Sequence, residues 1–476
     1  MKPAKNNFSP LTSYLSLLTT HFSPLTSYLS RLMSHPGVRR YGINTAWLFS
    51  EQILRMIAGF LVGVWVARYL GPEKFGLLSY ALAFVSIFQG IAKLGLDGIV
   101  VRDLVQEPEK RDVYLGTSFW LKLLGGVITF LIIAIILFIQ SIFTSNFFTE
   151  TNIYILIIAF GIIFQSFEVI DFYYQATVQA KYISIRRIIQ LILSSIIKIF
   201  LVLTGADLVW FVLVSLFDII SLSIMGWLIY RSQGLPNFVR YFDIEVGKKL
   251  LRDSWPLMIN SFLTLIILNN ANKIYLNNIY GSFSVGIYSS ALAITNMWTI
   301  ITVVVNSSLF PSITSAKLNN KELYKERILN LMRVLLLISF LSSITTYFFA
   351  DFLILKLYGY KYISAIPVLK ILVWSNIFVF LGNTSWQWYI NENKQHLAVY
   401  RLLFGSIISM TIGYFLIMRF YIYGAVFSTI LSYAVSFYIG NIFSISTREI
   451  FILQTKALLS FWKIKYILRS INNDKG

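Results

Sequence analysis

The stretch GPEKFGLLSYALA at residues 71–83 is repeated as GSFSVGIYSSALA at residues 281–293. At a constant offset of 210 residues, six of the thirteen positions are identical: Gly71/Gly281, Gly76/Gly286, Ser79/Ser289, Ala81/Ala291, Leu82/Leu292 and Ala83/Ala293. Each copy follows one apolar run and begins the next, and small residues at the start of a membrane span allow close helix approach. The repeat therefore predicts two halves built on one plan, with a central cavity between them.

The composition of the chain is that of a membrane protein. Of 476 residues, 57% are hydrophobic and 13% are charged, and the mean hydropathy is +0.70. Ordinary soluble domains have roughly 25% charged residues. There is no Cys. These values exclude a cytosolic globular enzyme, a secreted disulfide scaffold and a disordered chain, and they predict an all-α polytopic membrane protein.

Apolar runs that can cross a hydrocarbon core of about 30 Å number twelve. Their limits are 43–69, 75–99, 119–140, 151–175, 188–204, 208–230, 255–280, 285–310, 331–352, 366–390, 402–420 and 425–445. With the repeat, they predict two pseudo-symmetric six-helix lobes around a central cavity. The N-lobe would occupy 41–230 and the C-lobe 255–445, joined by a cytoplasmic linker at 231–254.

The charge of the loops predicts the orientation. With the N-terminus in the cytoplasm, the inside segments carry 30 Lys and Arg and the outside segments carry six. This asymmetry follows the positive-inside rule and places both termini in the cytoplasm. The net charge of +19 favours contact with anionic membrane lipids. Nucleic acid is not expected as a partner, because no basic domain stands apart from the apolar runs.

The two ends differ from the spans. Residues 1–40 form a low-complexity tail in which FSPLTSYLSLL (8–18) recurs as FSPLTSYLSRL (22–32). Met33 is an alternative start to Met1. The tail at 446–476 alternates basic and apolar residues, which is typical of an interfacial amphipathic helix or of a solvated basic tail.

The motif at 71–83, its copy, the twelve-span plan and the basic loops resemble the polysaccharide-transport proteins. These are the O-antigen or Wzx-type flippases of the multidrug/oligosaccharidyl-lipid/polysaccharide (MOP) exporter superfamily. The resemblance implies alternating access of two lobes around a polar, cationic cavity. The implied substrate is an undecaprenyl-diphosphate-linked oligosaccharide, an O-antigen or exopolysaccharide repeat unit, flipped across the bacterial inner membrane. It also implies other polysaccharide-assembly proteins as partners.

Three basic residues within the spans are candidates for binding the diphosphate: Arg55, Lys198 and Lys273. A charge at membrane depth is costly, and a desolvated anion requires such compensation. Arg55 lies one turn after Glu51, so an internal ion pair is the alternative for it. Lys198 and Lys273 have no acidic residue one turn away. Where Lys273 stands, the related proteins often carry an acidic residue, which weakens a cation site transferred from them.

Acidic residues within the spans are candidates for ion coupling or for ion pairs. Lys93 and Asp97 repeat the spacing of the pair in span one, so we expect them either to pair in the same way or, near the cytoplasmic end, to extend toward water. Gln165, Glu168 and Asp171 follow one face of span four.

Asp218 lies in the middle of span six. These acids either take up a proton or Na⁺, or pair with Arg55 and Lys198 in the same lobe.

Amide side chains are candidates for the sugar path, together with Gln165 and Glu168 of span four. Asn269 and Asn270 flank Lys273, and Asn376, Asn383 and Gln387 share one face of span ten. The aromatic residues between the span-ten amides are equally typical of an interfacial belt.

Motifs for reaction chemistry are not found. The sequence has no Walker loop, no HExxH or Cys cluster and no GxSxG elbow. We therefore expect no cofactor, no metal and no enzymatic activity. Two alternatives remain open: a drug or metabolite exporter of the same superfamily, and a membrane polysaccharide polymerase or glycosyltransferase. The outside loops are short for the second.

Overall fold

The computed structural model describes residues 36–144, 149–266 and 270–462, and these ranges are helical, with no strand among them. The helices are α2 (Pro36–Ala92), α3 (Leu96–Gln106), α4 (Arg111–Thr144), α5 (Glu150–Phe164), α6 (Val169–Ala176), α7 (Ala180–Leu203), α8 (Leu208–Ser232), α9 (Ile244–Leu265), α10 (Ala271–Tyr280), α11 (Ser282–Met297), α12 (Thr299–Asn319), α13 (Lys321–Leu357), α14 (Ala365–Leu372), α15 (Asn376–Asn391), α16 (Gln395–Met410), α17 (Ile412–Phe437) and α18 (Arg448–Leu458). Short 3₁₀ turns join several of them: η1 (Pro108–Lys110), η2 (Gln165–Glu168), η3 (Phe238–Arg240), η5 (Tyr360–Tyr362), η6 (Val373–Ser375), η7 (Ile439–Ile442) and η8 (Ile445–Thr447). Most of the predicted N-terminal tail lies outside the described residues.

Each of the twelve predicted spans overlaps described helices. Eight helical segments of the described chain are long and apolar enough to cross a membrane: Gly42–Gln106, Pro108–Ile142, Glu150–Ala176, Leu208–Ser232, Ser282–Asn306, Lys321–Leu357, Ala365–Asn391 and Ile412–Ile442. The first of them contains two predicted spans, because α2 turns back on itself at Gly71. The remaining predicted spans fall on the charged α7, on α9 with α10, and on α16 with the part of α17 that precedes its kink at Tyr421. The chain is a multi-pass membrane protein.

The motif repeat is a structural repeat. Gly71 (φ 74°, ψ 169°) and Gly281 (φ 83°, ψ 173°) each end one helical rod and begin the next with nearly the same backbone conformation. A positive φ with an extended ψ strains any residue with a Cβ, so glycine is required at both places. The duplication read from the sequence is thereby confirmed at the point where it is strongest.

A second correspondence, at an offset of 215 residues, extends the repeat. The turn after α6 and the turn after α15 both hold a non-glycine residue at positive φ, Val178 (56°) and Asn393 (55°). The next amide donates back to a tyrosine carbonyl in each turn, over 2.8 Å to Tyr174 and 2.9 Å to Tyr389. The fourth span of each half therefore ends in the same way.

The two halves touch backbone to backbone where α2 turns. A Cβ built on Gly76 would lie 1.8 Å from the carbonyl oxygen of Ser282, and one built on Gly286 would lie 1.9 Å from that of Pro72. Only glycine permits this approach of α2 and α11. We term the contact around Gly76 and Gly286 the glycine crossing.

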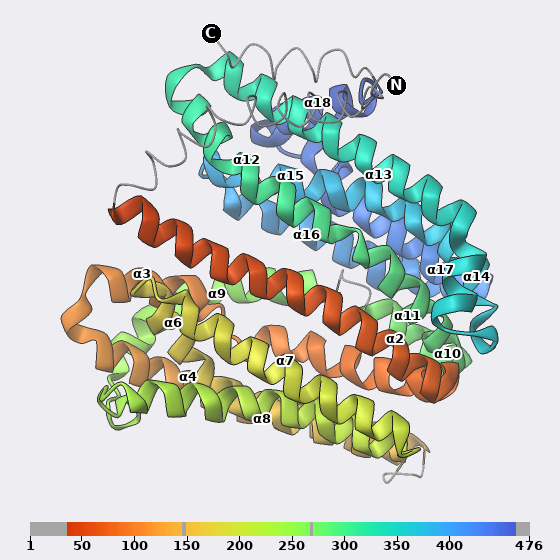
Figure 1. Cartoon of the computed structure of the whole chain (residues 1–476), viewed down its shortest axis with the longest axis horizontal. Coiled ribbons are helices and arrows are strands. Elements are labelled where there is room, and N and C mark those ends of the chain that lie inside the picture. Colours follow the sequence, from red (N-terminus) through yellow and green to blue (C-terminus); the bar gives the residue numbers. More distant parts are fainter. Residues whose placement is uncertain (1–35, 145–148, 267–269, 463–476) are drawn as a thin grey trace, which may run out of the picture.

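The buried core is shared at this end of the molecule and divided at the other. One apolar cluster joins both halves and includes Leu78 of α2 and Tyr288 of α11. Two further clusters are separate, one around Tyr114 in the first half and one around Met332 in the second. Figure 1 shows the resulting N-lobe, coloured orange to yellow-green, and C-lobe, coloured green to blue, with the first half of α2 in red between them.

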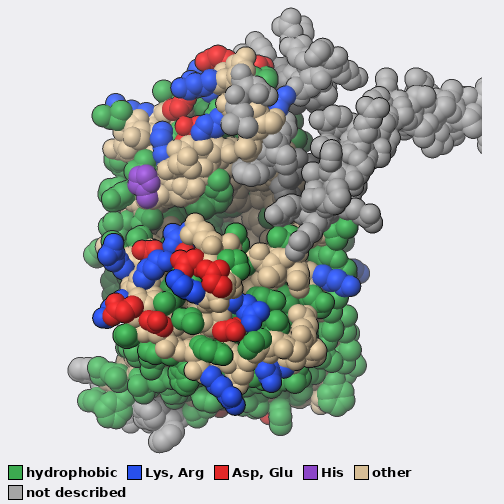
Figure 2. Space-filling view, turned by 90° about the vertical axis from the view of Figure 1, so that its left-hand side faces the viewer, with side chains coloured by type: hydrophobic (Ala, Val, Ile, Leu, Met, Phe, Trp, Pro, Cys, Tyr) green, Lys and Arg blue, Asp and Glu red, His purple; other side chains and the backbone are tan. Residues whose placement is uncertain are grey.

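Helix α9 connects the lobes at the divided end. The side chain of Asp243 caps it by accepting from the amides of Glu245 and Val246. Lys249 forms an ion pair with Asp103 of α3 (3.4 Å), while the other end of α9 accepts a hydrogen bond at Leu263 from α16. The second part of the predicted linker at 231–254 is therefore helical. Figure 2 shows Lys, Arg, Asp and Glu side chains gathered at this end, with hydrophobic flanks.

The described part of the predicted C-terminal tail packs against the C-lobe. Helix α18 buries Ile450 against the core that it shares with α13, and Glu449 forms an ion pair with Lys325 (2.9 Å). The amide of Gln454 donates to the hydroxyl of Ser385 on α15 (2.6 Å). Arg448–Leu458 is therefore helical, with one side of the helix buried against the C-lobe.

Candidate functional site

Two adjoining cavities lie along the inner side of the N-lobe. The first, of about 210 Å³, is lined by residues of α2, η2, α6, α7 and α8, and we term it the N-lobe chamber. Its polar lining is Gln89, Gln165, Glu168, Asp171, Arg186, Arg187 and Ser223. The second, of about 270 Å³, lies between the N-lobe and α10, and we term it the interlobe cavity. Its polar lining is Ser86, Gln89, Gln165, Asn270 and Lys273.

The polar face predicted for span four lines the chamber. The span is interrupted by η2, a 3₁₀ turn over Gln165–Glu168, before α6 begins. With three residues per turn, side chains three apart are eclipsed, so Gln165 and Glu168 point the same way. Asp171 follows three residues later and lines the same chamber.

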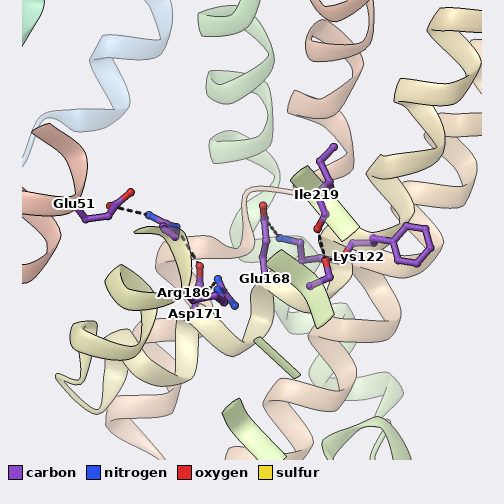
Figure 3. Close-up of polar contacts among 9 residues, drawn as sticks. Glu51, Lys122, Glu168, Asp171, Arg186 and Ile219 are labelled. Carbon is purple, nitrogen blue, oxygen red and sulfur yellow. Dashed lines mark hydrogen bonds and ion pairs between the residues drawn. The ribbon is translucent and has the colours of Figure 1, made fainter. Parts of the chain in front are cut away.

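A chain of alternating charges runs from α2 to α6. Arg55 Nε lies 3.1 Å from Glu51 Oε1, and the other oxygen of Glu51 lies 3.7 Å from Arg187. Arg187 also contacts Asp171 (3.1 Å), which Arg186 holds from its other oxygen at 2.5 Å. Figure 3 shows Asp171 beside Arg186. Glu51 lies on a different helix, and its carboxylate points toward these residues. The ion-pair alternative for Arg55 is the one that the structure has.

A second pair stands on the chamber wall. Lys122 Nζ lies 2.8 Å from Glu168 Oε2 (Figure 3). The Lys122 side chain is 1% exposed and lies over the ring of Phe172, whereas that of Glu168 is 38% exposed. The buried lysine therefore neutralises a carboxylate that faces the chamber.

For Asp218, pairing with Lys198 is the alternative that the structure has, so the charge of Lys198 is compensated. Its ammonium lies 3.0 Å from Asp218 Oδ2 on α8, and the amide of Gln190 donates to Asp218 Oδ1 (2.8 Å). The spacing along one helix carries no information about this partner, because the partner is on the next helix. As a diphosphate ligand, Lys198 is a weaker candidate than the sequence indicated.

Lys273 is the predicted basic residue whose charge is not compensated. It makes no ion pair or hydrogen bond to any residue that the structure describes, and it lines the interlobe cavity. Its neighbour Asn270 is buried and donates to the carbonyl of Leu265 (2.7 Å). Asn269 lies outside the described residues.

The expected pair of Lys93 and Asp97 does not form. Helix α2 ends at Ala92, and the chain then turns through positive φ at Leu94 (54°) and Gly95 (64°). Asp97 therefore stands exposed in the first turn of α3, on a different helix from the one that Lys93 follows. The i, i+4 argument requires one continuous helix, and this condition is not met.

The span-ten amides form a helix–helix seam instead of a sugar path. Each donates to a partner 81 residues earlier in the chain: Asn376 to Thr295 (3.2 Å), Asn383 to Thr302 (2.9 Å) and Gln387 to Asn306 (2.9 Å). Amides in an apolar bundle gain most from such interhelical bonds. None of the three lines the chamber or the interlobe cavity.

Three residues of the site were missed in the sequence: Lys122, Arg186 and Arg187. The predicted spans begin at 119 and 188, so these basic residues fell at or outside a membrane boundary. Helices α4 and α7 begin eight residues earlier, at Arg111 and Ala180. The match of Arg186 with Arg401 at the offset of 215 residues was the one available signal. No group of His, Cys, Asp and Glu that could hold a metal ion occurs in the described ranges.

A third, apolar cavity lies between the first half of α2 and the bend from α11 to α12. Its volume is about 560 Å³. The first residue of the chain that lines it is the one that follows Arg55. We term it the lateral groove. It is lined by Met56, Ile57, Phe60, Leu61, Ala293, Asn296, Met297, Trp298, Ile300 and Ile301.

Comparison with known proteins agrees with this architecture. The chain is 24% identical over 302 residues to the teichuronic acid biosynthesis protein TuaB of Bacillus subtilis (strain 168). The match spans 62% of this chain and 61% of the Bacillus protein.

Solved structures of multidrug transporters share the fold. An inward-facing MATE family transporter of the MOP superfamily superposes with a TM-score of 0.63 at 15% identity, covering 86% of this chain and 95% of that one. The eukaryotic MATE transporter AtDTX14 gives 0.57 at 13% identity, covering 86% and 99%. This likeness concerns the fold alone.

The sequence profile of the polysaccharide biosynthesis protein family matches residues 42–317, which is more than half of the chain. That range covers the motif, its copy and every residue of the N-lobe chamber. The chain belongs to the polysaccharide biosynthesis protein family and shares the fold of solved MATE transporters of the MOP superfamily.

Proposed function

We propose that the chain is a flippase for an undecaprenyl-diphosphate-linked oligosaccharide, an O-antigen or exopolysaccharide repeat unit. It would move this lipid from the inner to the outer leaflet of a bacterial inner membrane, with both termini in the cytoplasm. The family and the fold support a membrane transporter in polysaccharide biosynthesis. The substrate and the membrane are the proposal.

The observation that carries the proposal is the unpaired Lys273 in the interlobe cavity. An ammonium group that has left water without a counter-ion favours an anion at that place. A diphosphate supplies negative charge and several acceptor oxygens, and charge-assisted hydrogen bonds are the strong ones. Ion pairs with carboxylates are formed instead by these basic residues of the N-lobe: Lys122, Arg186, Arg187 and Lys198.

The surroundings of Lys273 suit the rest of such a lipid. The lateral groove is apolar and opens between α2 and α12, so it can receive the first isoprene units while the remaining chain stays among the lipids. Arg55 precedes Met56, the first lining residue of the groove along the chain, and its side chain is 49% exposed in spite of the pair with Glu51. The lobes touch at the glycine crossing and part toward the other end, as an alternating-access carrier requires when it loads from the cytoplasm.

The test is transport of a fluorescent undecaprenyl-diphosphate-linked saccharide in vesicles that contain the full chain. We expect Lys273→Ala to reduce the rate by about 10- to 100-fold, because one charge-assisted hydrogen bond contributes roughly 1.5–3 kcal/mol. Lys273→Arg retains the charge and should transport at a measurable rate.

Lys361→Ala, an exposed lysine in the η5 turn, is the matched control and should behave like the parent chain. Undiminished transport by a well-folded Lys273→Ala variant would remove the assignment of the phosphate site. Transport of amphipathic cations in place of the lipid would favour the drug-exporter alternative.

A further inference from the structure

We infer that the N-lobe chamber is a saccharide subsite that takes the single sugar ring next to the diphosphate. This inference rests on the proposed function, since it concerns the same ligand. It assigns to the chamber a neutral, polyhydroxylated ring, and it leaves the charge of the ligand to Lys273.

The position of the chamber supports this assignment. The chamber and the interlobe cavity share Gln89, Gln165 and Ile219 on their walls. A ligand whose phosphates lie at Lys273 can therefore extend its next group past Gln165 into the N-lobe. The chamber and the interlobe cavity are therefore adjacent.

The size of the chamber limits what can enter it. Its volume of about 210 Å³ is smaller than the roughly 300–1,000 Å³ of pockets for drug-sized ligands. One pyranose ring is of the right order, whereas an oligosaccharide is too large. The later sugars of a repeat unit would remain in the opening between the lobes.

The charges of the chamber favour a neutral ligand over an ion. Glu168 is paired with Lys122, and Asp171 is paired with both Arg186 and Arg187. Among the described residues, the chamber thus offers no free carboxylate for a metal cation and no free cation for a second anion. Paired ions still present both donors and acceptors at their edges, and hydroxyl groups of a sugar can use both.

Two polar atoms of the wall lack a partner. Gln165 is 7% exposed and Arg186 is 5% exposed, and neither Gln165 Oε1 nor Arg186 Nε has a hydrogen-bond partner within the part of the chain described. A buried polar group without a hydrogen-bond partner destabilises the folded state. One is an acceptor and the other a donor, and a hydroxyl group can serve each of them. Phe167 adds an apolar surface to the same wall.

The experiment compares the binding of four lipids to the full chain in nanodiscs. The probes are undecaprenyl diphosphate itself and the same lipid carrying glucose, N-acetylglucosamine or glucuronic acid. We expect at least one sugar-bearing lipid to bind the parent chain 10-fold or more tightly than the bare diphosphate. This ratio, the sugar gain, is the readout.

Two variants address the chamber by different means. Gln165→Leu removes the hydrogen-bonding atoms at nearly constant size, and Ser223→Phe, on α8, fills the space. Both should abolish the sugar gain. Ser223→Phe should also leave the affinity for the bare diphosphate unchanged, because Ser223 lines the chamber and not the interlobe cavity. Ile224→Phe is the matched control, because Ile224 is the next residue of α8, is 52% exposed and lies away from the chamber. It should retain the sugar gain.

The outcomes separate the two proposals. Equal affinity of the parent chain for all four lipids, or a sugar gain that survives both chamber variants, would overturn the saccharide subsite. Lys273→Ala should weaken all four lipids equally. If it changes none of them while Gln165→Leu still abolishes the sugar gain, the phosphate assignment fails and the saccharide subsite stands.

Discussion

The N-lobe and the C-lobe each bury an arginine at corresponding places, and they treat its charge differently. Arg186 is held by Asp171 at the edge of a polar chamber. Arg401, 215 residues later, is 4% exposed, and its Nε and Nη1 have no hydrogen-bond partner in the described ranges. Its guanidinium lies over the ring of Tyr389 at 4.6 Å. The residue that corresponds to Asp171 is Trp386.

The comparison shows that the duplication kept the backbone and changed the interior. The turns at Val178 and Asn393 are alike, but the C-lobe interior is filled with aromatic rings. A Cβ on Gly382 would lie 2.5 Å from the ring of Phe437, which leaves no space there for a polar chamber. The polar residues of the chamber thus come from the N-lobe, while the C-lobe places Lys273 at the interlobe cavity.

The largest loss of stability is expected at Asp171, whose carboxylate compensates the charges of Arg186 and Arg187. Asp171→Asn keeps the shape and removes the charge that Arg186 and Arg187 share. Breaking a buried pair from one side costs about 3–5 kcal/mol, because a buried charge remains uncompensated. Denaturant unfolding in detergent, with transport-independent detection of folded protein, measures it. A loss below about 1 kcal/mol would mean that water in the chamber already screens these charges.

The next largest loss of stability is expected at the glycine crossing, where the two lobes make mirrored contacts. Gly76→Ala and Gly286→Ala should each cost about 1–3 kcal/mol of stability, because each new methyl group overlaps a backbone carbonyl. The two losses should be similar, since the two contacts mirror each other.

Gly63→Ala is the control, since a Cβ at Gly63 meets nothing within 4 Å and alanine favours a helix. If both alanine variants are as stable as the parent chain, α2 and α11 do not make this backbone contact.

The smallest effect is expected in the C-lobe. Arg401→Met should change the stability by no more than about 1 kcal/mol, because removal of an uncompensated buried charge offsets the lost contact with Tyr389. Arg186→Met should cost more, since it leaves Asp171 with Arg187 alone. Thermal unfolding of both variants side by side gives the difference. Equal losses would mean that Arg401 has an anionic partner.

Features fixed by the local backbone could be predicted from the sequence. The repeat at Gly71 and Gly281 identifies the two halves because positive φ selects glycine wherever the turn occurs. The polar face of span four was likewise readable, since the spacing of three persists in the 3₁₀ turn.

Contacts between helices could not be predicted in this way. Lys198 and Asp218 lie 20 residues apart on neighbouring helices, and no periodicity along one helix indicates that they meet. The expected pair of Lys93 and Asp97 was wrong for the opposite reason. A helix end at Gly95 interrupts the continuous register on which that expectation depends.

The glycine crossing has a consequence for the proposed alternating-access cycle, in which the two lobes would have to part. Main chain lies against main chain there, so no side chain of Gly76 or Gly286 has to be withdrawn before α2 and α11 separate. The same two missing methyl groups thus permit close contact and unobstructed separation.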